Sequence, residues 1–130
     1  MKIMVCFDGS KSSKEAVRLA IDHARAFGAS MAIVTSMVKG TESERADIEK
    51  TELDLEYEKN IVVNEGIACE YHLLIRGLSA GEDLLRFAEE QKIDEIVIGI
   101  KRRSKVEKLV FGSTAQYVIL KALCPVVTVK

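Results

Sequence analysis

The sequence is poor in the residues that mark several common classes of protein. Aromatic residues make up 5% of the 130 residues and tryptophan is absent, so the stacking surfaces that single-stranded nucleic acid requires are scarce. No apolar run approaches the roughly 20 residues of a membrane-spanning helix. The net charge of -1 supplies no overall field for nucleic acid or an anionic membrane. We therefore expect a protein that binds neither nucleic acid nor membrane.

Cysteine pairs are also missing. Cys6, Cys69 and Cys124 form no CxxC motif, and their odd number excludes a complete disulfide framework. The apolar run that follows Lys2 is too short for the core of a secretory leader. Buried thiols in a reducing compartment fit this pattern, so we expect a cytoplasmic protein.

Strands are predicted from two kinds of apolar pattern. Continuous apolar runs predict strands that are buried on both faces, at residues 2–7, 30–38 and 93–100. Residues 67–75 instead alternate apolar with more polar side chains, which predicts an edge strand with one wetter face. A last strand is predicted at 126–129, after the only proline.

Helices are predicted between these strands. In the first, Ser12 or Ser13 is the expected N-terminal cap and Gly28 the expected stop. Helical spacing predicts that its sheet-facing residues are Val17, Ala20, Ile21, Ala24 and Phe27. A long charged helix reaching residue 64, a helix at 79–91 and a helix from about 113 to 123 complete the pattern.

The order of elements is βαβαβαβαβ, which predicts an α/β fold. Strands that alternate with helices form a parallel sheet with helices on both faces, and right-handed crossovers make it doubly wound. We predict a Rossmann-like, five-stranded sheet with strand order 3-2-1-4-5. No repeat, low-complexity tract or proline-rich linker divides the sequence, so residues 1–130 are predicted to be one domain.

The predicted fold directs attention to the ends of the first and fourth strands. Ligands of doubly wound sheets bind beyond the carboxyl ends of the strands, where strand order reverses. Asp8 and Gly99 stand at these two ends. The Asp8 carboxylate can accept hydrogen bonds from ribose hydroxyls or an adenine amino group. The alternative is that Asp8 holds the Asp-Gly turn or caps the next helix.

A second candidate feature opens the last helix. Gly112, Ser113 and Thr114 would place backbone N–H groups, the helix dipole and two hydroxyls at one point, which favours an anion. An ordinary helix cap is the alternative. The basic loop before them contains Arg102, whose guanidinium can bind a phosphate at that helix end.

The C-terminal stretch VIGIKRRSKVEKLVFGSTAQYVILKALCPVVTVK resembles the corresponding third of universal stress proteins. The similarity extends along the chain, through the first strand and turn VCFDGS and the terminal A-x-C-P-V strand. The most specific family feature is a phosphate loop of Gly, two residues, Gly, nine residues, and Gly-Ser or Gly-Thr. Gly99 and the Gly112-Ser113 pair keep this spacing, whereas Arg102 replaces the middle glycine.

The resemblance implies an adenine nucleotide ligand, ATP or AMP, with Mg²⁺ as an accompanying ion. Asp8 would contact ribose or adenine, and the backbone at Cys6, Phe7 and Met37 would border the base. The phosphates would be held by Gly99, Gly112, Ser113 and Thr114. Arg102 has no counterpart in the family pattern: it either contacts phosphate or fills the pocket.

The resemblance also implies a stress-response and signalling role without efficient catalysis. The sequence has no P-loop motif and no paired base and nucleophile, so at most slow ATP hydrolysis is expected. His23 and His72 are expected to be solvated. The strand at 126–129 is uncharged and lacks the features that protect a sheet edge, which predicts a homodimer through that strand. A further signalling partner of unknown identity is also expected.

Two alternatives remain at this point. In the first, Arg102 blocks the pocket and the protein is a nucleotide-free dimeric interaction module. In the second, the serines at 10, 12 and 13 hold a flavin phosphate, as in flavodoxin-like carriers, although few aromatic residues are present to cover a flavin.

Overall fold

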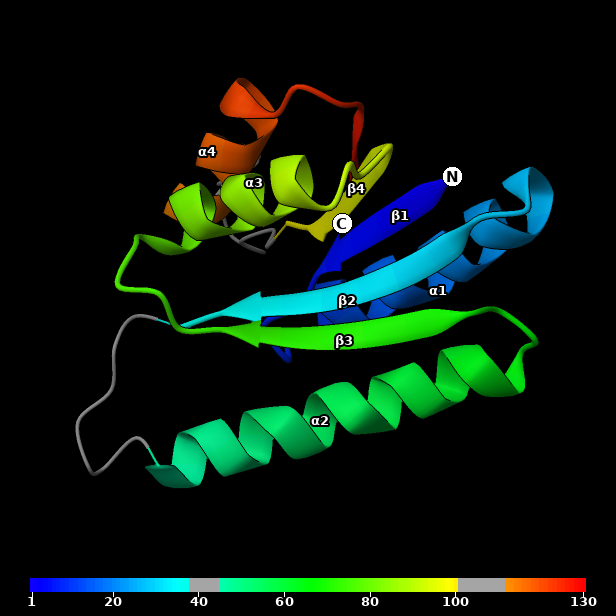
Figure 1. The fold of residues 1–130 in the computed structure, drawn as a ribbon, viewed down its shortest axis with the longest axis horizontal. Helices are drawn as coiled ribbons and strands as arrows, with labels where there is room; N and C mark the ends of the chain where they lie inside the picture. The colour runs from blue at the N-terminus through cyan, green and yellow to red at the C-terminus, as the bar shows by residue number, and fades with distance from the viewer. Residues whose placement is uncertain (38–44, 101–111) are drawn as a thin grey trace.

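The computed structural model describes residues 1–37, 45–100 and 112–130 (Figure 1). The five strands are β1 (Lys2–Cys6), β2 (Ser30–Ser36), β3 (Cys69–Leu74), β4 (Glu95–Gly99) and β5 (Val126–Val129). The helices of the described part are α1 (Lys11–Phe27), α2 (Arg45–Asn64), α3 (Ala80–Glu90) and α4 (Ser113–Lys121).

The strands form one parallel sheet with the order β3-β2-β1-β4-β5. This arrangement confirms the predicted fold class and strand order. The strand order reverses at β1, which lies between β2 and β4. In the register of the sheet, Cys6 is opposite Val34 of β2 and Ile98 of β4. The carboxyl ends of the three central strands therefore finish side by side, where a ligand site is expected.

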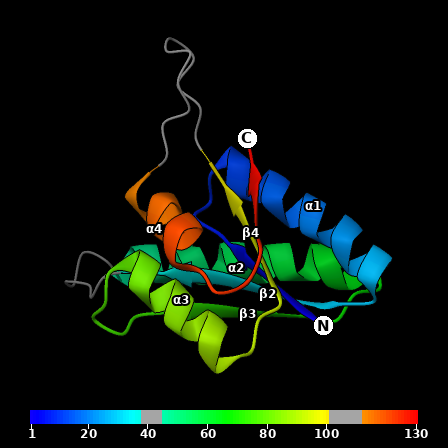
Figure 2. The ribbon, with the colours of Figure 1, turned by 90° about the horizontal axis from the view of Figure 1, so that it is seen from above.

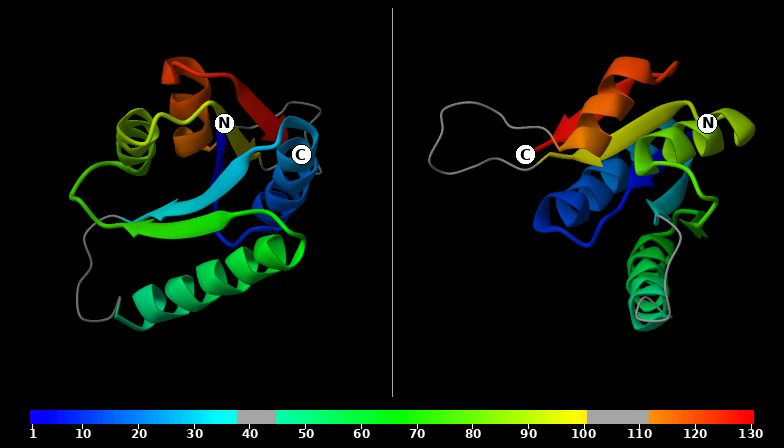
Figure 3. Two further views of the ribbon diagram at one scale, coloured as in Figure 1. Left: turned by 45° about the vertical axis from the view of Figure 1, so that its right-hand side comes forward. Right: turned by 90° about the vertical axis from the view of Figure 1, so that its left-hand side faces the viewer.

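Helices cover both faces of the sheet. Figure 2 shows α1 on one side and α3 with α4 on the other, and Figure 3 shows α2 below the β2–β3 edge. Successive residues of β1 enter opposite cores: Ile3 and Val5 pack with α1 and α2, whereas Met4 and Cys6 pack with α3 and α4. Burial on both faces explains why the central strands are continuous apolar runs.

The first helix starts earlier than predicted. Its cap is Ser10, whose side chain accepts a hydrogen bond from the Ser13 N–H at 3.2 Å. Gly28 ends α1 as predicted, with a left-handed φ of 66° that L-residues with side chains rarely adopt. Four of the five predicted sheet-facing residues are buried, namely Val17, Ala20, Ile21 and Ala24. Phe27 was wrongly included: in the last turn it is 55% exposed.

The second helix lies on the surface, as its charged sequence predicts. It buries Leu55 and Val62, whereas Leu53 and Tyr57 on its outer side are each 66% exposed. Within the described ranges, no helix combines the length and apolar character needed to cross a membrane.

Candidate functional site

A pocket of about 290 Å³ lies at the carboxyl edge of the sheet, where β1, β2 and β4 end. Its walls come from these three strand ends and from the N-terminal parts of α1, α3 and α4. Seven of the nine residues that the sequence predicted for the site line it: Cys6, Phe7, Asp8, Gly99, Gly112, Ser113 and Thr114. The remaining lining residues are Ser13, Val34, Thr35, Ser36, Ala80, Leu84, Ile98, Ile100 and Ala115.

Two predicted site residues are placed differently. Met37 is not among the residues that line the pocket, and its N–H continues the β2–β3 ladder by donating to the Leu74 carbonyl at 2.8 Å. Arg102 lies outside the described residues, so its role stays a sequence-based prediction.

Asp8 has a structural role in addition to its place in the pocket. Its Oδ1 accepts a hydrogen bond from the Ser10 N–H at 2.9 Å, which closes the turn between β1 and α1. Gly9, between them, has φ of 80°, the left-handed region that favours glycine. The turn-holding alternative for Asp8 is therefore correct. Asp8 is also exposed and lines the pocket, so the turn places this residue at the site.

Gly99 is required by the fold itself. A Cβ added there would lie 2.5 Å from the carbonyl carbon of Ser12 and 2.7 Å from its oxygen. The end of β4 thus approaches the backbone of the first turn of α1 so closely that only glycine fits. This contact is a reason for glycine that is independent of any ligand.

The start of α4 provides donors. Gly112 occupies the N-cap position with ordinary extended dihedrals and makes no side-chain cap hydrogen bond. The N–H groups of the first turn have no acceptor within their own helix, and the helix dipole adds positive potential at the same point. Since Gly112, Ser113 and Thr114 all line the pocket, these donors are available to an anion there.

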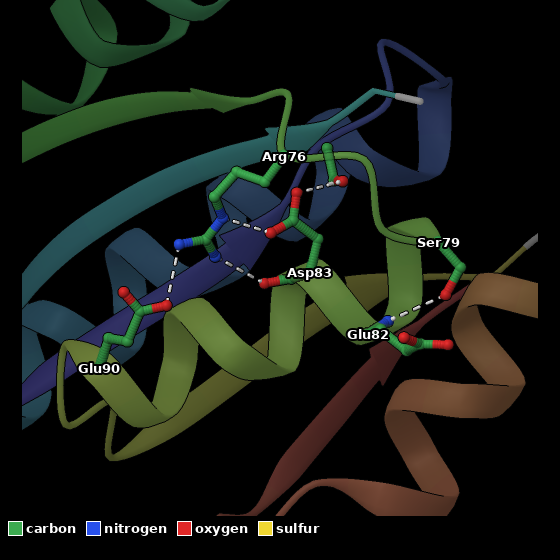
Figure 4. A network of polar contacts seen from close by, with 6 residues as sticks. Arg76, Ser79, Glu82, Asp83 and Glu90 are labelled. Atoms are coloured by element: carbon green, nitrogen blue, oxygen red, sulfur yellow. Dashed lines mark hydrogen bonds and ion pairs between the residues drawn. The ribbon is translucent and has the colours of Figure 1, made fainter. Parts of the chain in front are cut away.

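Another part of the pocket lining was not predicted from the sequence. It consists of the end of β2 and the start of α3, with Thr35, Ser36 and Ala80 in the lining. Figure 4 shows the polar network behind it, in which Arg76 reaches across to Asp83 and Glu90 of α3. The only sequence signal for this part of the lining was that two hydroxyl residues follow the apolar residues 31–34 at the end of the strand.

Cys6 is the one cysteine among the described residues that line the pocket. Burial, followed by the charges of Cys124 and Asp8, raises the pKa of the Cys6 thiol to about 12. Cys6 is therefore protonated at neutral pH and is a poor nucleophile. In the part of the chain that the structure describes, no group of three or more His, Cys, Asp or Glu side chains is arranged to hold a metal ion.

The two histidines lie elsewhere and are less solvated than predicted. His23 is hydrogen-bonded through Nδ1 to Oε1 of Glu95, a buried carboxyl group, at 2.6 Å. His72 packs against the ring of Phe87 with 4.8 Å between the centroids. Neither lines the pocket. Packing against neighbouring elements, which a single sequence does not reveal, accounts for the error.

The fold and pocket define a class: a doubly wound α/β domain with an anion-favouring site where strand order reverses. Within this class, the chain belongs to the universal stress protein family, whose model matches residues 1–130. The family resemblance seen in the sequence is thereby confirmed.

Individual relatives agree with this assignment. The chain is 32% identical over 139 residues to a universal stress protein of Methanocaldococcus jannaschii, covering 99% of this chain and 81% of the relative. The structure of a universal stress protein from Archaeoglobus fulgidus matches with 38% identity and a TM-score of 0.90, covering 100% of this chain and 98% of the other. An Archaeoglobus fulgidus universal stress protein in complex with dAMP matches with 35% identity and a TM-score of 0.85, at the same coverage.

Proposed function

We propose that this protein binds an adenine nucleotide, AMP or ATP, in the pocket between β1 and β4. The observation that carries the proposal is the set of polar groups in one pocket: Asp8 and the N-terminus of α4 both line it. A carboxylate accepts from ribose hydroxyls, and helix N–H groups donate to phosphate. The similar Archaeoglobus fulgidus protein solved with dAMP supports the same ligand class.

The walls of the pocket also suit a nucleotide. Its volume of about 290 Å³ is near the lower end of the roughly 300–1,000 Å³ typical of small-molecule sites. Val34, Leu84 and Ile98 supply an apolar surface for the faces of a base. Mg²⁺ would enter with ATP, since this ion is commonly bound through substrate phosphates.

The protein is proposed to act as a binding module in stress-response signalling and not as an enzyme. Among the described residues of the pocket, Cys6 is held as a neutral thiol and no histidine is present. A nucleotide bound there would meet donors for its phosphates but no paired base and nucleophile, so ATP turnover would be slow at most. The signalling partner is of unknown identity, and the cytoplasm is the proposed compartment because the cysteine pattern fits a reducing environment.

Titration calorimetry with AMP and with ATP and Mg²⁺ tests the proposal directly. We expect saturable binding of one nucleotide per chain, and mass spectrometry of ligand released from freshly purified protein should identify an adenine nucleotide. Absence of heat with both nucleotides would refute the proposal and favour the nucleotide-free interaction module. A flavin absorbance band in the purified protein would favour the flavodoxin-like alternative.

We further propose a homodimer through β5. Among the described residues this strand is an edge of the sheet and pairs with β4, and it carries no charged residue. The Pro125 carbonyl accepts from the N–H of Ile96 in β4, and the Val129 carbonyl accepts from the N–H of Ile100, which directly follows β4. Because backbone groups alternate along a strand, Val127 also faces β4, whereas Val126 and Thr128 direct their N–H groups to the open edge. A second copy of β5 can pair there.

Light scattering at micromolar concentration tests the dimer. We expect a dimeric mass for the parent and a monomeric mass for Thr128→Pro, which removes an outward N–H without breaking the β4–β5 ladder. Thr128→Val is the control, since it keeps the N–H and should remain dimeric. A monomeric parent would refute the proposed interface.

A further inference from the structure

A glycine in the first turn of α3 is explained by its neighbour in α4. Gly81 is buried, and its φ is not in the left-handed region, so its backbone conformation does not require glycine. Glycine is also costly in a helix, because it loses more conformational freedom on folding than other residues. A Cβ added at this position would lie 2.7 Å from Cδ1 of Tyr117 and 2.9 Å from its Cβ and Cγ. Gly81 therefore lets Tyr117 pack directly on the backbone of α3.

This contact joins the two helices close to the pocket. Figure 2 shows α3 and α4 on the same face of the sheet. Ala80, which precedes Gly81, lines the pocket. In α4, Tyr117 comes four residues after Ser113, so the two share a helix face about 5.4 Å apart. Because Ser113 lines the pocket at the donor end of α4, the contact sets the distance between that end and α3.

The first turn of α3 is fixed by directional polar contacts. Asp83, two residues after Gly81, is fully buried, and its Oδ1 accepts from Nε of Arg76 at 2.6 Å (Figure 4). Its Oδ2 accepts from the hydroxyl of Ser36, at the end of β2, at 3.1 Å. Nη2 of Arg76 also donates to the Asp83 carbonyl at 3.2 Å. These charge-assisted contacts tie α3 to β2 and to the segment that follows β3.

The last helix is held to the core by apolar contacts. Its buried residues are Ala115 and Val118, which pack in the apolar core on that face of the sheet. Apolar packing is not directional, whereas the contacts of Asp83 are. A side chain that forces the two helices apart at Gly81 should therefore displace α4 and leave α3 in place.

We propose that Gly81 and Tyr117 are positioning residues for nucleotide binding: their contact places the N–H groups at the start of α4 where they meet the phosphate. This inference rests on the proposed nucleotide site and names what sets one side of it. Groups that bind a ligand must be held within about 0.5 Å of their working geometry. A Cβ that starts 2.7 Å from Tyr117 must move to an ordinary contact of at least 3.4 Å, which exceeds that tolerance.

Gly81→Ala tests the proposal with AMP and adenosine as the two probes. We expect calorimetry to show AMP binding weakened about fivefold or more, because the displaced N–H groups lose hydrogen bonds to the phosphate. Adenosine has no phosphate, so its affinity should change less than about twofold. A purely structural role of the contact would lower the urea midpoint and leave the ratio of AMP to adenosine affinity unchanged.

A second pair of variants assigns the effect to the contact itself. Tyr117→Ala removes the ring carbons that the new Cβ meets and leaves only the Cβ contact at 2.9 Å. In the Tyr117→Ala background, Gly81→Ala should therefore weaken AMP binding about twofold or less. Gln116→Ala, at the neighbouring exposed position outside the pocket lining, is the matched control background, in which the fivefold loss should persist. Tyr117→Ala alone loosens α4 without a clash and should also lower the AMP-to-adenosine ratio.

The outcomes separate the two proposals. If the parent does not bind AMP, the proposed function fails. If the parent binds AMP and Gly81→Ala binds it equally well, or loses AMP and adenosine to the same extent, the nucleotide site stands and the positioning role is refuted. A fivefold loss that persists in the Tyr117→Ala background also refutes it, because the effect would then belong to residue 81 without its partner.

Discussion

Two glycines of the pocket separate the requirements of folding from those of binding. Gly112 has φ of -64° and ψ of 159°, which other residues adopt, and no described residue lies within 4 Å of a Cβ added there. Gly112→Val should therefore cost about 1 kcal/mol or less, from weaker capping of α4. In the complex, the branched side chain would crowd the phosphate. Losing one or two charge-assisted hydrogen bonds, at about 1.5–3 kcal/mol each, weakens AMP binding at least tenfold.

Gly99→Ala should show the opposite behaviour. The new Cβ would lie 2.5 Å from the Ser12 carbonyl carbon, so the backbone of β4 or α1 must move. Inserting an extra carbon into a well-packed region typically costs about 1–3 kcal/mol, and a backbone neighbour places this case at the upper end.

Urea unfolding and AMP calorimetry on both variants decide between these expectations. Gly112→Val should unfold close to the parent midpoint but bind AMP weakly, whereas Gly99→Ala should unfold at clearly lower urea. Parent-like AMP affinity in Gly112→Val would refute the phosphate site at α4. A parent-like midpoint for Gly99→Ala would show that the Ser12 contact does not constrain the fold.

Three further predictions concern charged groups. Arg76→Gln leaves buried Asp83 without its cation and should cost about 2–3 kcal/mol in urea unfolding, whereas Arg86→Gln, at an exposed position of α3, should change little. Burial raises the pKa of the Glu58 carboxyl in the folded protein above the ordinary Glu value of about 4.3, which applies to the unfolded chain. The free energy of unfolding therefore falls as pH rises through the interval between these two pKa values. Glu58→Gln should therefore be more stable than the parent at pH 7 and equal to it below that interval, as urea midpoints at several pH values will show. From the sequence alone, Arg102→Ala should weaken ATP binding about tenfold in calorimetry and leave adenosine binding unchanged; tighter ATP binding by Arg102→Gly would identify Arg102 as a plug instead.

The fold was predictable because its signals are local in the sequence. Continuous apolar runs identified the central strands, and the alternating run at 67–75 identified β3 as an edge. Gly28 marked the end of α1 because the residue after a helix often adopts a left-handed backbone conformation, which favours glycine. The cap at Ser10 was missed because three neighbouring serines satisfy the same pattern, and only the geometry of the Asp8 turn selects among them.

The hydrogen bond between Ser36 and Asp83 could not be predicted, because it joins distant segments of the chain. Ser36 and Asp83 are separated by 47 positions. An aspartate in the first turn of a helix, such as Asp83, is normally explained by the helix dipole and expected at the surface. Asp83 is instead completely buried, because Arg76 supplies a cation for its carboxylate. Arg76 lies just after β3, and the two residues meet only in the folded protein.

The structure also changes which residues are informative about nucleotide binding in this family member. Gly99 fits the spacing of a phosphate loop, but its contact with Ser12 requires glycine even in a protein that binds nothing. Its presence therefore does not distinguish a nucleotide-binding protein from an interaction module of the same fold. Gly112 is different, because no described residue near it requires glycine for folding. The proposed phosphate would supply that requirement, so Gly112 is where nucleotide binding should be tested.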